Sequence, residues 1–167
     1  MTEPQRSHND LQLDEIESGV VAVFSESAHS LGLPPSVGSI YGVFFASVLP
    51  LCLDDVVARL GISKGSASQG LRQLRQFGAL RPVSHGNGRR EYFVPNTELK
   101  KLVGGFLRSQ LLPEIQAGVQ ESHRLSKQAG ALGDSERARV LRGRLEKLKT
   151  WQRRGLQVLS LMERFLD

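Results

Sequence analysis

Apolar residues recur at helical intervals along most of this chain. Residues 13–31 and 34–49 each carry one apolar stripe, and the glycine and prolines between them separate two predicted helices. Within the second segment, Gly38 and Gly42 lie one turn apart, so another helix can approach closely at that point. The chain therefore begins with a pair of amphipathic helices, and Pro50 closes the second of them.

A second, tighter pair of helices is predicted next. Its first helix has one buried face and ends at Gly61, and its second helix is capped by Ser63 and runs to about Phe77. Two aspartates in the first turn of the first helix suit the positive end of the helix dipole. The apolar positions of that helix are Leu53, Val56, Val57 and Leu60.

Two short segments then favour strands. Residues 80–84 and 89–94 flank the turn-forming run His85-Gly86-Asn87-Gly88, and Pro82 limits the first strand to the edge of a sheet. The predicted fold class is therefore mainly α with a small β-hairpin.

Helical periodicity returns after residue 97. Pro113 is expected to end or kink a helix, so two helical pieces are expected between residues 98 and 127. Residues 130–134 form a break, and a long amphipathic helix is expected over residues 135–165.

Composition narrows the class of protein. The chain has 167 residues, with 22 Lys and Arg against 17 Asp and Glu and a net charge of +5, which favours an anionic partner such as nucleic acid. The single cysteine, Cys52, excludes an intramolecular disulfide framework. The polar N-terminus MTEPQRSHND does not look like a signal peptide, and the longest apolar stretch, residues 40–53, is too short to cross a membrane. We therefore expect a cytoplasmic protein without a membrane partner.

The second helix of the tight pair carries the chemistry. Ala67, Leu71 and Leu74 cluster on one side in helical projection, which leaves a polar face opposite. Arginine can donate two hydrogen bonds to guanine and glutamine can pair with adenine, so this face suits the DNA major groove. Hydroxyls near the start of the helix and basic residues at its flanks suit phosphate. The candidate DNA-binding residues of this helix are Ser63, Lys64, Ser66, Ser68, Gln69, Arg72, Gln73, Arg75 and Gln76.

The placement of charge agrees with this interpretation. No acidic residue lies between Asp55 and Glu91, whereas basic residues recur throughout the interval. Arg89 and Arg90 follow the glycine-rich turn and are candidates to enter a minor groove, whose negative potential attracts arginine. A solvated amphipathic helix followed by an ordinary hairpin is the alternative. The joint occurrence of helix pair, polar face, acid-free interval and basic hairpin favours binding to double-stranded DNA.

The stretch from about Leu31 to Val94 resembles a known family. The sequences PPSVGSIYG at Pro34–Gly42 and LDDVVARLGISKGSAS at Leu53–Ser68, with the hairpin after FGAL, are similar to the GbsR-like branch of the MarR superfamily of bacterial transcription regulators. The flanking helices match that family only in kind.

The resemblance implies a winged helix-turn-helix in which residues 63–77 are the recognition helix and Arg89 and Arg90 lie in the wing. It also implies a homodimer that represses or activates at an operator, in some members under control of a small molecule. Ala67 and Gly70 depart from the family pattern, so a base preference is not transferred.

This organisation predicts three parts. Residues 11–33 form an N-terminal dimerisation helix, residues 34–96 the DNA-binding domain, and residues 97–167 C-terminal helices for dimerisation and an effector site. A dimer would place two recognition helices one DNA turn apart, ~34 Å. The alternative is that the outer helices pack on their own domain. The basic run Arg137–Arg154 is either a further contact to the DNA backbone or a solvated helix face, and solvated faces are commoner.

Aromatic residues offer a candidate effector pocket. Aromatic walls can hold a quaternary ammonium such as choline or glycine betaine, although plain core packing is their more common role. The candidate lining residues are Tyr41, Phe44, Phe45, Phe106 and Trp151.

Other chemistry is not expected. Cys52 among leucines is more often core filler than a redox sensor, and the histidines lack metal-ligand spacing, so no metal or other cofactor is predicted. No catalytic triad, paired carboxylates or phosphate loop is recognisable, so we predict no enzyme.

We expect a homodimeric transcription regulator, a repressor, that binds DNA. A protein-interaction module of the same fold is the alternative, and the polar centre of the second helix argues against it, since protein-binding faces are apolar at their centre.

Overall fold

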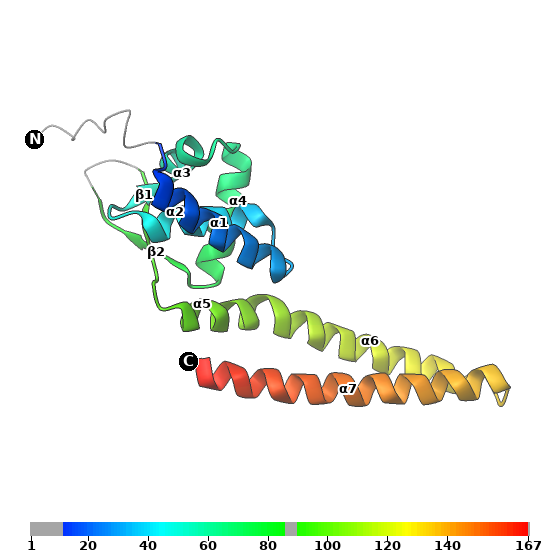
Figure 1. The fold of residues 1–167 in the computed structure, drawn as a ribbon. Coiled ribbons are helices and arrows are strands. Elements are labelled where there is room, and N and C mark those ends of the chain that lie inside the picture. The colour runs from blue at the N-terminus through cyan, green and yellow to red at the C-terminus, as the bar shows by residue number, and fades with distance from the viewer. Residues whose placement is uncertain (1–11, 86–89, 167) are drawn as a thin grey trace, which may run out of the picture. The chain divides into compact units, whose positions relative to one another are not determined.

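Residues 12–85 and 90–166 are described by the computed structural model of the protein (Figure 1). They form a mainly helical protein with one small antiparallel sheet of three strands. The chain divides into two compact units, Met1–Leu102 and Val103–Asp167. Among the described residues, no helix is both long enough and apolar enough to cross a membrane.

The first unit begins with a helix whose start is fixed by its own side chains. The backbone N–H of Glu17 donates to the Asp14 carboxylate at 2.7 Å, and the Asp14 N–H donates to the Glu17 carboxylate at 3.1 Å. The elements of this unit, in chain order, are α1 (Glu15–Ser30), α2 (Pro35–Ala46), β1 (Leu51–Cys52), α3 (Leu53–Leu60), α4 (Lys64–Gln76), β2 (Leu80–Val83) and β3 (Tyr92–Pro95), followed by α5 (Leu99–Phe106), which runs into the second unit.

Two glycines of α2 bring α1 and α2 together at very short range. A Cβ atom on Gly38 would lie 2.6 Å from the carbonyl carbon of Phe24, and one on Gly42 would lie 2.7 Å from the Cα of Val21. The close approach predicted at Gly38 and Gly42 is therefore confirmed. Because backbone meets α2 at both points, α1 can be displaced only by moving the whole helix.

The sheet has the order β1–β3–β2, with antiparallel pairing throughout. β2 lies at an edge, as Pro82 predicts. The sequence pattern did not indicate β1, because a strand of two residues carries no periodicity. β1 is defined by pairing with β3, where Leu51 lies opposite Phe93. The predicted start of the second strand, Arg89, lies outside the described residues.

The core of the first unit gathers around α2. Ile40, Val43 and Phe44 are fully buried, and the Phe44 ring meets the edge of the Phe93 ring with centroids 6.5 Å apart. The apolar face of α4 packs against α2 from another direction. α4 is thereby fixed to the rigid part of the unit, and its opposite face is left to solvent.

The two helical pieces that Pro113 predicts between residues 98 and 127 are present. A π-helix, η2 (Leu107–Leu111), joins α5 to α6 (Leu112–Gly130), and Pro113 lies in the first turn of α6. An α-helix would require an amide hydrogen that Pro113 lacks, and a wider turn just before it changes the hydrogen-bond register without ending the helical run. The α-helix is therefore interrupted just before Pro113, as predicted, and the interruption takes the form of a π segment.

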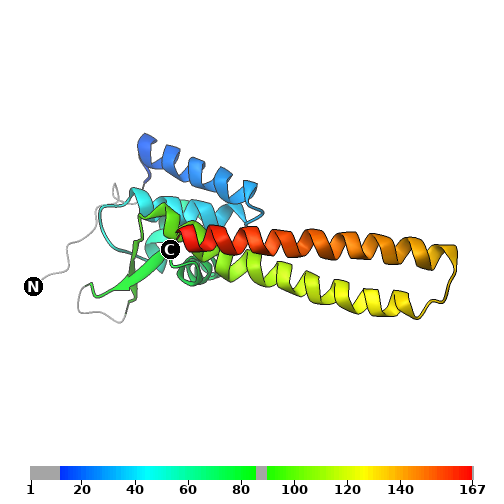
Figure 2. The ribbon, with the colours of Figure 1, turned by 90° about the horizontal axis from the view of Figure 1, so that it is seen from below.

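The helices α6 and α7 (Glu136–Leu166) lie side by side as an antiparallel hairpin, which both views show (Figures 1 and 2). The predicted break at residues 130–134 is confirmed: α6 ends at Gly130, and Gly133 adopts φ +72°, a conformation that favours glycine. The Arg142 guanidinium closes the turn by donating to the carbonyl oxygens of Ala129 and Gly133 at 3.3 and 3.0 Å. This arginine of the basic run therefore has a structural role.

Candidate nucleic-acid interface

The turn between α3 and α4 is built as the sequence predicts. Gly61 ends α3 with φ +62°, a left-handed conformation that costs a side-chain-bearing residue free energy. Ser63 caps α4, since its Oγ accepts the N–H of Ser66 at 3.1 Å. The Ser63 hydroxyl also lies 3.0 Å from the Ser66 hydroxyl. Two helices are thus joined by a short, well-defined connection.

One face of α4 is buried and contains Ala67 and Gly70. Ala67 is fully buried, and a Cβ atom on Gly70 would meet Cδ1 of Ile40. Leu71 and Leu74 complete this face, as predicted. Gly70 is therefore small because Ile40 of α2 is close, and Ala67 and Gly70 both face the core.

The opposite face of α4 is exposed and polar. Gln73 is the exception, because it is half-buried at the margin of the packed face. Its side chain is less available to a groove of DNA than those of its neighbours. The exposed residues of the predicted set are Ser63, Lys64, Ser66, Ser68, Gln69, Arg72, Arg75 and Gln76.

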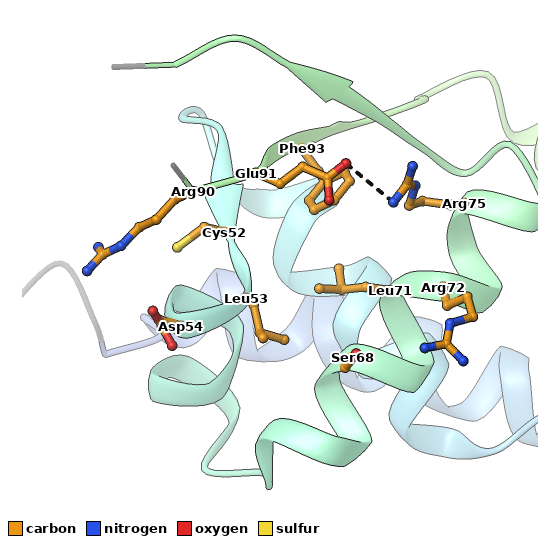
Figure 3. A pocket seen from close by; sticks show the side chains of 10 residues that line it. All are labelled: Cys52, Leu53, Asp54, Ser68, Leu71, Arg72, Arg75, Arg90, Glu91 and Phe93. Carbon is orange, nitrogen blue, oxygen red and sulfur yellow. Dashed lines mark ion pairs between the residues drawn. The ribbon is translucent and has the colours of Figure 1, made fainter. Parts of the chain in front are cut away.

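A cleft of about 420 Å³ runs between α4, the start of α3 and the chain that leads into β3 (Figure 3). Figure 3 shows Arg75 turned toward Glu91, with Arg90 on the far side of the cleft from Arg72 and Arg75. The cleft therefore brings four of the predicted DNA-binding residues together with residues that were not predicted. The four are Ser68, Arg72, Arg75 and Arg90. Its lining residues are Cys52, Leu53, Asp54, Ser68, Leu71, Arg72, Arg75, Arg90, Glu91 and Phe93.

Two of the basic side chains are held by carboxylates. Nη1 of Arg75 lies 3.3 Å from a carboxylate oxygen of Glu91, and the Arg75 guanidinium lies 5.4 Å above the centre of the Phe93 ring. Nζ of Lys64 lies 2.9 Å from a carboxylate oxygen of Asp54. The hydrogen bond and positive charge of Lys64 lower the pKa of the Asp54 carboxyl group.

Sequence reasoning missed these carboxylates as members of the site. The available signal was the acid-free interval itself, because Glu91 ends it and Asp54 lies just before its start. Phe93 was also missed, since its contact with Arg75 depends on the pairing of β3 and on the orientation of α4.

The predicted hairpin is described only in part. Arg90 is exposed and lines the cleft, whereas Arg89 and the turn residues 86–88 lie outside the described residues. The His85 ring packs against the ring of Tyr92, with centroids 4.8 Å apart. Arg90 is thus the described arginine of the pair predicted to enter a minor groove.

Cys52 is one of the residues that line the cleft, and its side chain is buried. Burial raises the pKa of the Cys52 thiol, which disfavours the reactive thiolate. Both observations favour the core-filling interpretation of this cysteine. Among the described residues, no group of three or more His, Cys, Asp or Glu side chains is arranged to bind a metal ion.

The five aromatic residues of the predicted effector pocket have different environments. In the first unit, Tyr41 and Phe44 are buried, and Tyr41 and Phe45 pack around Phe24 with centroid distances of 4.8 and 5.1 Å from it. The Tyr41 hydroxyl donates to the Asn96 carbonyl at 2.7 Å. In the second unit, Phe106 is buried and Trp151 is 73% exposed.

Comparison with known proteins adds information on the fold. No protein-family model and no curated protein matches this chain. Among solved structures, one described as the crystal structure of a transcriptional regulator has a similar fold, with a TM-score of 0.54 and 21% sequence identity. The similarity covers 87% of this chain and 99% of that one.

Proposed function

We propose that this protein is a transcription regulator that binds double-stranded DNA through a winged helix-turn-helix formed by α3, α4 and the β2–β3 hairpin. The main support is the exposed polar face of α4, a helix whose other face is fixed to the core. Fold similarity to a protein described as a transcriptional regulator supports the same proposal.

In this proposal α4 enters a major groove. Gln69, Arg72 and Gln76 face base edges, with Ser66 and Ser68 near the start of the helix and Gln73 at the margin. Lys64 and Arg75 contact phosphate, and Arg89 and Arg90 are assigned to contacts with the backbone or a minor groove. Arginine and glutamine supply the hydrogen-bond donors and acceptors that distinguish one base pair from another.

We propose further that the protein acts as a homodimer. The outer face of α7 exposes large apolar side chains that recur at helical spacing, and proteins rarely leave such a stripe in water. A second copy can cover it, because two-fold pairing places the same stripe on both sides of an interface. The stripe comprises Trp151, Val158, Leu161, Met162 and Phe165, whose side chains are 46–87% exposed.

The finer assignment rests on the resemblance of residues 31–94 to the GbsR-like branch of the MarR superfamily. On that basis we propose a repressor whose affinity for its operator responds to a small molecule. Phe45 and Trp151 are the two exposed residues of the predicted effector set. A rise in melting temperature with glycine betaine or choline would support such an effector, and no shift at millimolar ligand would count against it.

Selection from a pool of randomised duplexes tests the proposal. The expected result is enrichment of one inverted repeat whose half-sites lie about one helical turn apart, because a two-fold dimer presents two recognition helices. Failure to enrich any sequence, by a protein shown to be folded, would contradict a sequence-specific regulator.

A further inference from the structure

The two side chains assigned to phosphate are both engaged by carboxylates, whereas the arginine assigned to base edges is not. Arg75 pairs with Glu91 at 3.3 Å and Lys64 pairs with Asp54 at 2.9 Å. Within residues 12–85 and 90–166, Arg72 forms no ion pair. Asp54 and Glu91 therefore pair with the two α4 side chains assigned to phosphate, and neither acid pairs with Arg72, which is assigned to base edges.

The Arg75–Glu91 pair is open to exchange. The Arg75 and Glu91 side chains are 47% and 55% exposed, so a DNA phosphate can reach the arginine and water can solvate the released carboxylate. Phe93 lies beneath the guanidinium at 5.4 Å and supports it without adding charge. Exposed ion pairs are weak, so phosphate can replace Glu91 without unfolding any element.

We propose that Glu91 is an intramolecular competitor of DNA phosphate for Arg75 and weakens the binding of DNA of any sequence. This inference rests on the proposed function. When a DNA phosphate binds Arg75, the phosphate releases its cation, but the freed Glu91 carboxylate attracts a cation from solution. The exchange therefore releases almost no net counterion. Without Glu91, the same contact releases a counterion, which is the driving force for non-specific binding.

Glu91→Gln is the central test, and binding of a random-sequence duplex is followed by fluorescence anisotropy over a range of salt concentrations. The variant is expected to bind about two- to five-fold more tightly per subunit at low salt, the range that one exposed ion pair provides. Its plot of log affinity against log salt should steepen by ~0.9 per subunit. Circular dichroism and thermal melting check that the variant is folded.

Glu98→Gln is the matched control. Glu98 pairs with Lys101 at 2.9 Å, and the two side chains are 53% and 47% exposed, close to the values for Glu91 and Arg75. Glu98→Gln changes the net charge by the same amount as Glu91→Gln but leaves the Arg75–Glu91 ion pair intact. A second control repeats Glu91→Gln in an Arg75→Gln background, where the gain in affinity is expected to disappear.

The outcomes separate the two proposals. If wild-type protein binds neither random DNA nor its own upstream DNA at low salt, the proposed function fails and this inference fails with it. If wild type binds but Glu91→Gln matches wild type or Glu98→Gln, only the inference is overturned. A gain that persists in the Arg75→Gln background also overturns it, because Glu91 would then act as a general negative charge.

Discussion

Replacement of Gly38 by alanine tests whether α1 is held against α2 as described. The added Cβ would overlap the carbonyl oxygen of Phe24 and lie 2.8 Å from the Cβ of Ala28. Carbon atoms prefer separations of ~3.5–4.0 Å, so α1 must move by roughly 1 Å. The obstacle is backbone, and no rotamer change can relieve it.

The magnitude follows from two opposing effects. Overpacking costs about 1–3 kcal/mol, and a shift of a whole helix belongs in the upper part of that range. The better helix propensity of alanine stabilises the folded protein by at most about 1 kcal/mol. The net effect of Gly38→Ala is therefore a loss of ~1–2 kcal/mol in the free energy of unfolding. For a unit of the length of Met1–Leu102, this loss of stability lowers the melting temperature by roughly 5–15 °C.

Gly19→Ala is the matched variant. Gly19 lies in α1, and a Cβ atom there would meet nothing within 4 Å, so the substitution is expected to stabilise by ~0.5–1 kcal/mol. Urea unfolding is followed through tyrosine, because Tyr41 and Tyr92 both lie in the first unit, while Trp151 fluorescence reports on the second. If Gly38→Ala is as stable as Gly19→Ala, the close packing of α1 on α2 is wrong.

Three further predictions concern other parts of the molecule. Arg72→Ala should cost ~1–3 kcal/mol on the selected site and relax the choice at one base pair, whereas equal weakening on random DNA would make Arg72 a phosphate contact. Burial raises the pKa of Tyr41 from 10.0 to about 12, so the unfolded chain loses this proton first, and the free energy of unfolding should fall by ~2 kcal/mol between pH 10 and 12. For Tyr41→Phe, the free energy of unfolding measured with urea should lack this contribution to the fall between pH 10 and 12. An equal fall in the two proteins would refute the prediction. Val158→Asp should lower the dimer fraction in sedimentation experiments by placing a charge in the proposed interface, and an unchanged dimer would locate the interface elsewhere.

Features for which a short stretch of sequence carries a signal could be predicted. Gly61 and Ser63 mark helix ends because a left-handed residue and a capping hydroxyl act within one turn of the backbone. Gly38 and Gly42 reveal a close helix contact because glycine is the residue that leaves room for another backbone. The polar face of α4 follows from helical periodicity alone.

Features that depend on distant residues and leave no local signal in the sequence could not be predicted. β1 exists because Leu51 and Cys52 meet β3, and two residues carry too little pattern to indicate a strand. The partnership of Arg75 with Glu91 depends on how the chain entering β3 lies beside α4. Pro113 signals a disturbed helix but does not specify a π segment, since the outcome depends on what the wider turn packs against.

The most direct test of the account is binding of the purified protein to its own upstream DNA and to a random duplex of equal length, each titrated with salt. A site-specific regulator is expected to bind the upstream duplex more tightly, and its affinity for both duplexes should fall steeply as salt replaces phosphate contacts. Absence of binding to either duplex at low salt, by folded protein, would contradict it.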